Sequence, residues 1–187
     1  MLTGMDSLPL PLCTPRLTLR PHRLDDAASL LAYYSRPEVA VHLLEEPWTP
    51  EYAAEQSQSL TRRTGLETAA RALALVIEHE GRVIGDVALW LTEEELPVAE
   101  IGWVLDPRHG ARGFAAEAAG ALLRAGFETY GLHRVAAQMD ARNTASARLA
   151  ERIGMTREAH LRQNWWSKGE WTDTVVYGAL STDALPG

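Results

Sequence analysis

A predicted strand, a loop of small residues and a predicted helix follow one another in the middle of the chain. The strand spans residues 100–105, and the helix runs from about 115 to 130. The first N–H groups of such a helix have no internal partner, and its dipole favours negative charge. Between the two elements, Gly113 lets a ligand approach the backbone and Arg112 adds a positive charge. The segment predicts a site for a phosphate-bearing cofactor, with an ordinary turn as the alternative.

The charge balance restricts the possible partners. Eighteen basic against 25 acidic side chains give a formal net charge of −7. A general nucleic-acid-binding domain is expected to be basic, so we exclude nucleic acid as a partner. An acidic protein is compatible with cationic substrates, although many proteins are acidic for solubility alone.

We expect no metal site, no intrachain disulfide bond and no membrane-spanning helix. The six histidines lack helical i,i+4 pairing, which argues against a metal site, and Cys13 is the only cysteine. No stretch approaches the length of about 18 apolar residues that a membrane helix needs, and the N-terminus does not read as a signal peptide. We therefore expect a soluble, cytoplasmic protein.

The order of patterns predicts one domain. Residues 1–14 read as a loose N-terminal arm, residues 15–182 as a single domain and residues 183–187 as a short tail. Predicted strands come first as hairpins and later alternate with helices, and this order is typical of a mixed α/β (α+β) protein. We expect a mixed sheet with helices on both of its faces.

The collinear motifs resemble the GNAT superfamily of N-acetyltransferases, and within it the RimJ/RimL-like branch. The match covers nearly the whole chain. The motifs are Arg16-Leu17-Thr18-Leu19-Arg20-Pro21, Asp25-Asp26, Pro37-Glu38-Val39, Glu100-Ile101-Gly102-Trp103, Gly113-Phe114-Ala115-Ala116-Glu117-Ala118, Asn143-Thr144-Ala145-Ser146, Ile153-Gly154-Met155 and Val176-Tyr177-Gly178.

The resemblance implies a mostly antiparallel sheet that splays in the middle and binds acetyl-CoA there. Unpaired backbone groups of Trp103, Val104 and Leu105 would bind the pantetheine amides, since such groups are costly to leave unpaired. The pyrophosphate would lie on the backbone at the helix N-terminus. The residues implied there are Gly110, Ala111, Arg112, Gly113, Phe114 and Ala115.

The loop departs from the family pattern at two positions. The pattern usually reads Gln/Arg-x-x-Gly-x-Gly/Ala, and Gly110 holds the Gln/Arg position here. Ala111 stands where many members have glycine. Arg112 or Arg108 is expected to restore the missing charge.

Acetyl transfer to an amine needs a neutral amine and a proton for the departing thiolate. Glu100, on the central strand, is the candidate base, and its alternative role is an ion pair at the strand edge. Many members place a tyrosine acid seven residues after the position of Asn143, but this chain has Ala150 there. The resemblance makes Ser146 the candidate acid and Asn143 a cofactor contact. Alternatively, Asn143 caps a helix and Ser146 is an ordinary first-turn residue.

The acceptor is expected to be a primary amine, attacked directly in a ternary complex. It is either a protein N-terminal α-amine, such as that of a ribosomal protein, or a small-molecule amine. Residues 39–48, with Trp165 and Trp166 of the last hairpin, are expected to form the acceptor groove. Glu45, Glu46 and Asp86 are expected to attract a cation to it.

Two other functions stay open. Because the usual tyrosine and the usual Gln/Arg are absent, the chain can also be a non-catalytic acyl-CoA-binding or sensor protein. A third possibility is a dimeric scaffold in which an exposed strand pairs with a second copy, and a homodimer would not exclude catalysis.

Overall fold

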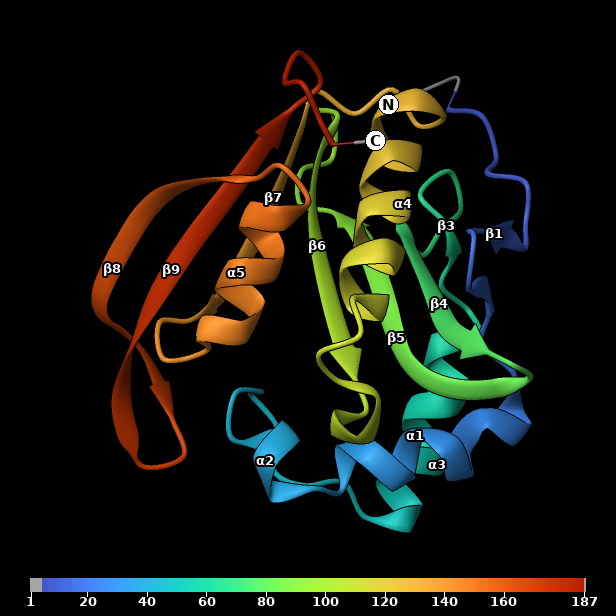
Figure 1. Cartoon of the computed structure of the whole chain (residues 1–187), viewed down its shortest axis with the longest axis vertical. Helices are drawn as coiled ribbons and strands as arrows, with labels where there is room; N and C mark the ends of the chain where they lie inside the picture. The colour runs from blue at the N-terminus through green and yellow to red at the C-terminus, as the bar shows by residue number, and fades with distance from the viewer. Residues whose placement is uncertain (1–4, 187) are drawn as a thin grey trace.

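The computed structural model describes residues 5–186, folded as a nine-stranded sheet with helices around it (Figure 1). The strands are β1 (Leu12–Cys13), β2 (Thr18–Pro21), β3 (Thr64–Gly65), β4 (Ala72–His79), β5 (Arg82–Leu91), β6 (Val98–Leu105), β7 (Arg134–Asp140), β8 (Thr156–Ser167) and β9 (Glu170–Leu180). The helices are α1 (Ala27–Tyr34), α2 (Pro37–Ala40), α3 (Pro50–Leu60), α4 (Phe114–Glu128) and α5 (Thr144–Arg152), with 3₁₀ turns at Leu24–Asp26 and Pro107–His109.

The sheet is mixed and mostly antiparallel, as predicted. Its strand order is β1-β2-β4-β5-β6-β7-β9-β8, and β3 pairs with β4 outside this path. Only the β6–β7 pair is parallel among the described strands. The β4–β5 hairpin turns at Glu80-Gly81, where both residues have positive φ (51° and 74°). This conformation gives a tight turn that matches the right-handed twist of the strands.

Helices cover both faces of the sheet, which confirms the expectation. On one face, Leu73, Leu75 and Ile77 of β4 share a buried core with Leu122 of α4. Figure 1 shows α4 and α5 lying in front of the sheet on this side. On the other face, Ala74 packs in a smaller core with residues of α1 and α3. The alternation of side chains along β4 therefore supplies two cores.

The two central strands separate after a short common ladder. β6 and β7 pair at Val98–Arg134, Ala99–Val135 and Glu100–Ala136. Beyond these pairs, residues 101–105 and 137–140 of the described chain have no mutual pairing. Each strand instead follows its outer neighbour to its end, β6 with β5 and β7 with β9. The predicted splay is confirmed, and it lies next to the loop that precedes α4.

The expectation that residues 1–14 are loose is wrong for residues 5–14. Leu12–Cys13 form β1 against β2, and Met5, Leu8 and Leu10 pack against the main core. Apolar side chains at these positions gain more by burial than by solvation, which the proline-rich composition concealed. Residues 1–4 lie outside the described chain, as does Gly187 of the predicted tail. Within residues 5–186 no helix is both long and apolar enough to cross a membrane.

Truncation of Leu122 to alanine tests the main core. Leu122, in α4, is fully buried, whereas Leu96 is 55% exposed in the β5–β6 connection. Leu122→Ala leaves a cavity and is expected to destabilise the protein by about 2–5 kcal/mol, which lowers Tm by roughly 5 °C or more. Leu96→Ala is the matched control and should leave Tm nearly unchanged in thermal unfolding followed by circular dichroism. Equal effects of both substitutions would contradict this packing.

Candidate active site

The loop between β6 and α4 presents free backbone N–H groups. Gly113 is the N-cap of α4 with φ 80°, and it provides no side chain to cap the helix. The first amides of the helix are therefore open to an anion. Ala111 also has positive φ, 58°. This left-handed conformation costs a non-glycine residue roughly 1 kcal/mol, which accounts physically for a glycine preference at this position.

Arginine side chains around the loop serve different purposes. The sequence predicts that Arg112 or Arg108 restores the missing charge. The guanidinium of Arg108 binds the buried carboxylate of Asp106 (Nε–Oδ2, 2.9 Å). Burial raises the pKa of Asp106, but these bonds and the charge of Arg108 outweigh burial and hold it below its usual value. Arg112 is exposed and lies 4.7 Å from the centre of the Phe114 ring. Of the two arginines, Arg108 is thus occupied by a carboxylate, while Arg112 lies over an aromatic ring next to the loop.

A contact between distant segments fixes this loop. Arg16 donates from Nε to Oε2 of Glu117 (2.6 Å) and from Nη1 to the carbonyl of Arg112 (2.9 Å). Thr14 Oγ1 donates to the other Glu117 oxygen (2.6 Å). Arg16 thereby neutralises an acidic side chain in the first turn of α4. Sequence reasoning missed this contact, because its partners are 101 residues apart.

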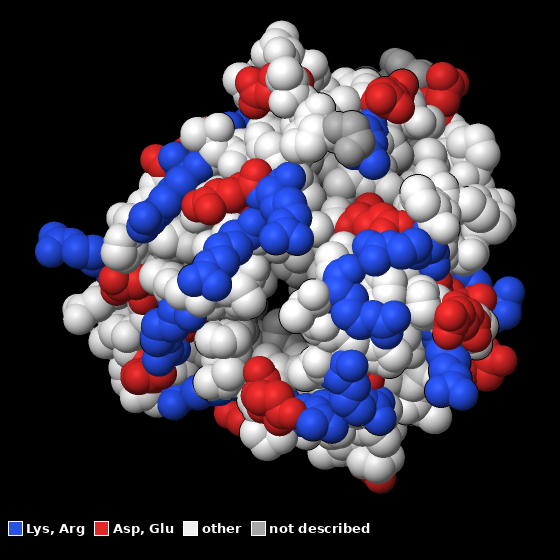
Figure 2. All heavy atoms as spheres, viewed as in Figure 1, with Lys and Arg blue, Asp and Glu red and all other residues white. Residues whose placement is uncertain are grey.

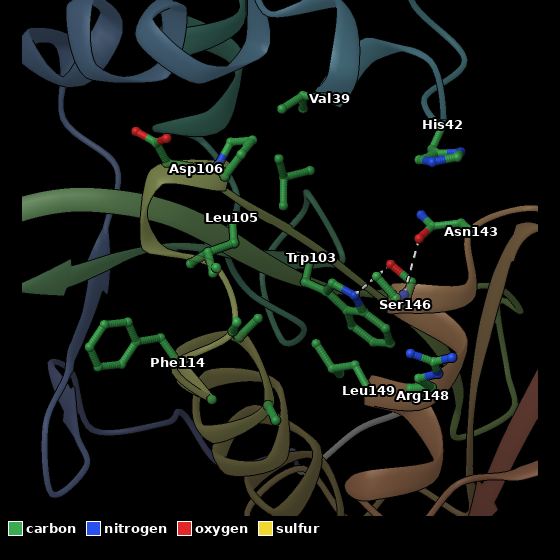
Figure 3. A pocket seen from close by; sticks show the side chains of 18 of the residues that line it. Val39, His42, Trp103, Leu105, Asp106, Phe114, Asn143, Ser146, Arg148 and Leu149 are labelled. Atoms are coloured by element: carbon green, nitrogen blue, oxygen red, sulfur yellow. Dashed lines mark hydrogen bonds between the residues drawn. The ribbon is translucent and has the colours of Figure 1, made fainter.

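A first cavity of about 520 Å³ lies between β6, the loop and α5. Figure 3 shows Trp103, Leu105, Ser146 and Leu149 around it. Arg148 and Arg152 also line it, as do the acidic Glu38 and Asp106, and basic side chains lie on several sides of a hollow on this face of the molecule (Figure 2). The negative and positive side chains of the described lining are therefore balanced, unlike those of the whole chain. Of the residues expected to hold the pyrophosphate, Gly110, Ala111, Gly113 and Ala115 line the cavity, whereas Arg112 does not belong to its described lining.

A second cavity of about 280 Å³ lies on the other face of the sheet, next to Tyr34 and Leu60. The two cavities share six lining residues: His42, Leu43, Trp103, Val104, Asn143 and Ser146. They therefore meet at the gap where β6 and β7 separate. This arrangement lets ligands that enter from opposite faces approach each other.

Ser146 lies where the cavities meet. Its hydroxyl accepts a hydrogen bond from Nε1 of Trp103 (3.2 Å), and its backbone N–H donates to Oδ1 of Asn143 (3.0 Å), as Figure 3 shows. Since the indole N–H can only donate, the Ser146 proton is available to another acceptor. The helix-cap role of Asn143 is confirmed, and its side-chain NH₂ is left to face the cavities.

The strand residues expected to bind the cofactor differ in the direction of their backbone groups. The N–H of Asp106 donates to the carbonyl of Ile84 on the β5 side (2.8 Å). Because backbone groups alternate along a strand, those of Val104 also face β5, while those of Trp103 and Leu105 face the gap. The expected free backbone of Val104 is therefore wrong, since Val104 pairs with Asp86 of β5. Val104 contributes its side chain to the cavities instead.

Two other predicted site residues occupy unexpected surroundings. The Phe114 side chain is 1% exposed and points away from the cavity toward His79, so only its backbone can meet a ligand (Figure 3). Glu100 belongs to the last β6–β7 pair, and its carboxylate accepts from Nε2 of Gln138 (2.6 Å). Gln138 lines the second cavity, whereas Glu100 is absent from the described lining of both.

Asp86 is the carboxylate that lines the second cavity. It is 8% exposed, and the hydroxyl of Tyr34 lies 3.0 Å from both of its oxygens. Burial raises the pKa of Asp86 to about 7. Sequence reasoning named Asp86 only as an attractor of cations. The signal available was a lone acidic residue within the otherwise apolar run 83–91.

The expected acceptor groove is only partly present. Val39, His42 and Leu43 line the cavities, but Glu45 and Glu46 do not belong to the described lining. Trp165 and Trp166 are 47% and 58% exposed and also lie outside it. The tip of their hairpin instead contacts the 39–48 segment through Lys168 Nζ, which donates to the carbonyl of Leu43 (3.0 Å). Residues 5–186 contain no cluster of His, Cys, Asp or Glu that could hold a metal ion.

Comparison with known proteins agrees with this geometry. The family described as acetyltransferase (GNAT) domain matches residues 16–156. The chain is 31% identical over 172 residues to the uncharacterized N-acetyltransferase p20 of Bacillus licheniformis, covering 92% of this chain and 97% of that protein.

Solved structures have the same fold. The crystal structure of a GNAT family acetyltransferase from Bacillus anthracis has a TM-score of 0.82 at 26% identity and covers 92% of this chain and 99% of that one. RimL, a ribosomal L7/L12 α-N-protein acetyltransferase in complex with coenzyme A, has a TM-score of 0.78 at 20% identity, with coverage of 91% and 97%. The chain belongs to the GNAT acetyltransferase family and is an N-acetyltransferase that uses acetyl-CoA.

Proposed function

We propose that this enzyme transfers the acetyl group directly from acetyl-CoA to a primary amine within a ternary complex. The observation that carries the proposal is the meeting of two cavities at Trp103 and Ser146, one from each face of the sheet. Acetyl-CoA occupies the first cavity and supplies a thioester to the amine in the second. Direct attack needs no covalent enzyme intermediate, only the correct orientation of both ligands.

The cofactor contacts follow from the backbone. Trp103 and Leu105 offer their gap-facing N–H and C=O groups to the pantetheine amides. The N–H groups between Gly110 and Ala115, including that of Phe114, bind the pyrophosphate with the helix dipole. Arg112 adds charge at the rim, and Asn143 contacts the pantetheine through its side-chain NH₂.

Proton transfers are assigned to polar groups near the gap. Ser146 donates its hydroxyl proton to the departing thiolate, a group whose ordinary pKa of about 8.5 makes a weak donor sufficient. Glu100 is the base proposed from the sequence. Its carboxylate does not belong to the described lining of the second cavity, and it is connected to that cavity through its hydrogen bond with Gln138.

The acceptor is a primary amine: the α-amine of a polypeptide N-terminus, such as that of a ribosomal protein, or a small-molecule amine. Support comes from the RimJ/RimL-like motif order and from the structural likeness to RimL, which by itself concerns the fold. A cavity of about 280 Å³ suits one terminal residue or a small amine. We place the enzyme in the cytoplasm with such acceptors; a homodimer through an exposed strand stays a prediction.

Substitution of Gly113 by alanine tests the phosphate site. Gly113 and Gly131 flank α4, and both have positive φ, 80° and 63°. Alanine strains either position by about 1 kcal/mol, but only Gly113 lines the first cavity. Gly113→Ala is expected to weaken coenzyme A binding by roughly 10-fold or more in isothermal titration calorimetry, because it disturbs the N–H groups that hold the anion. Gly131→Ala should reduce Tm similarly without changing Kd, and equal Kd values for the two variants would refute this placement.

An acceptor screen with a serine variant tests the chemistry. Wild-type enzyme is incubated with acetyl-CoA and a panel of peptides and small amines, and products are identified by mass spectrometry. Ser146→Ala should lower kcat by about 10-fold or more. The control is Thr144→Ala, because Thr144 is exposed in the same helical turn and outside both cavities. Acetyl-CoA binding without turnover of any amine would favour the sensor function instead.

A further inference from the structure

The second cavity contains one buried carboxylate in largely apolar surroundings. Asp86 lies on β5 opposite Val104, and its side chain faces α1 and α3. The neighbouring cavity wall is largely apolar or aromatic and includes Leu43, Leu60, Ala88, Trp90, Trp103 and Met139. A carboxylate in such surroundings is costly to ionise unless a cation or hydrogen bonds compensate for the lost water.

The protein supplies hydrogen bonds to Asp86 but no counter-ion. The Tyr34 hydroxyl lies 3.0 Å from each oxygen, and the ring of Tyr34 stacks on Trp48 with centroids 3.9 Å apart. The Tyr33 hydroxyl of the same helix is buried near Asp86 without a hydrogen-bond partner in the described structure; burial, and next the charge of Asp86, raise its pKa. Within residues 5–186, no Lys, Arg or His nitrogen lies within 4.0 Å of Asp86. The place of the counter-ion is thus left to a ligand.

We propose that Asp86 binds the ammonium group of the acceptor and removes its proton before attack, which makes Asp86 a catalytic base of this enzyme. The inference rests on the proposed function and deepens it. Asp86, on β5, and Ser146, on α5, both line this cavity. In this arrangement the base, Asp86, serves the amine, and the acid, Ser146, serves the thioester.

The proton balance is complete with these two groups. Asp86 takes one proton from R–NH₃⁺, and the N–H electron pair becomes the nucleophilic lone pair. A C–N bond then forms at the thioester carbon and the C–S bond breaks, its electron pair going to sulfur. Ser146 gives its proton to sulfur and takes the second proton from nitrogen. Asp86 finally releases its proton to solvent, leaving an amide and free thiol.

The electrostatic surroundings suit a base that works near neutral pH. Burial raises the pKa of Asp86 and the hydrogen bonds from Tyr34 partly oppose this, so that the pKa lies at about 7. Arg63 and His42 line the same cavity. The charge of Glu45, in the 39–48 segment, helps to raise the pKa of Tyr34, and that of Asp106, just after β6, helps to raise the pKa of Tyr33. A base with a pKa near the working pH combines a large ionised fraction with useful basicity.

The acceptor class follows from the same cavity. A primary ammonium group pairs with Asp86, and aromatic faces of Tyr34, Trp90 and Trp103 accommodate a cation and a small apolar substituent. Alcohols and thiols carry no positive charge and lack the pairing with Asp86. We therefore assign basic primary amines, rather than hydroxyl compounds, as its substrates.

The pH dependence of kcat/KM tests the inference with an amine that the wild-type enzyme acetylates. The wild-type value should rise with pH through about 7, as Asp86 ionises. Asp86→Asn should lower kcat/KM by about 100-fold or more and abolish this rise, called the limb below. The kcat/KM of the variant should then rise only as the pH approaches the amine pKa near ~10. Tyr34→Phe removes a bond that stabilises the carboxylate, so its limb should move to higher pH.

The controls separate this inference from the function on which it rests. Asp25→Asn changes an exposed aspartate outside both cavities and should match wild type. Glu100→Gln should retain the limb, whatever its absolute rate. Circular dichroism and the Kd for coenzyme A verify that Asp86→Asn is folded and binds the cofactor.

Each failure has a distinct outcome. If Asp86→Asn keeps the limb near pH 7, or Glu100→Gln alone abolishes it, Asp86 is not the base while the transferase function stands. If the wild-type enzyme binds acetyl-CoA but acetylates no amine, both the role of Asp86 and the proposed function are overturned.

Discussion

The active site depends on strand groups that the sheet leaves unpaired. β6 pairs along its length with β5, and β7 with β9, so each central strand is held on its outer side. Their own ladder ends at Glu100–Ala136, and the gap-facing backbone of Trp103 and Leu105 has no strand partner there. Leaving such groups buried and unsatisfied costs roughly 1–3 kcal/mol each. A ligand with amide groups can satisfy them, which couples the fold directly to cofactor binding.

The surrounding structure keeps this gap in place. The indole of Trp103 donates to Ser146, which connects β6 to α5 across the separation. At the first turn of α4, Arg16 connects the N-terminal segment to Glu117 and to the loop before α4. These contacts position free N–H groups at a helix N-terminus without placing an unpaired acidic side chain beside them. In the proposed placement of the pyrophosphate, the anion meets mainly backbone groups, so this placement does not need the family's usual Gln or Arg.

Local patterns predicted the frame of this site well. The strand stop before the loop, the glycine at 113 and the hairpin turn at Glu80-Gly81 are all set by neighbouring residues, so the sequence shows them directly. The family resemblance predicted the splay between β6 and β7. The environments of Asp86 and Arg108 could not be read in this way. Asp86 acquires its character from Tyr34, 52 residues away, and the guanidinium of Arg108 is bound by a carboxylate two residues before it.

Amide hydrogen exchange resolved at single residues measures the central claim most directly. Without ligand, the N–H groups of Trp103 and Leu105 should exchange rapidly, while that of Val104 is protected by β5. Saturating coenzyme A should slow exchange at Trp103 and Leu105 by about 10-fold or more and leave Val104 unchanged, because only gap-facing groups gain a partner. Equal protection of all three amides in the free protein, or no change on adding coenzyme A, would contradict the account.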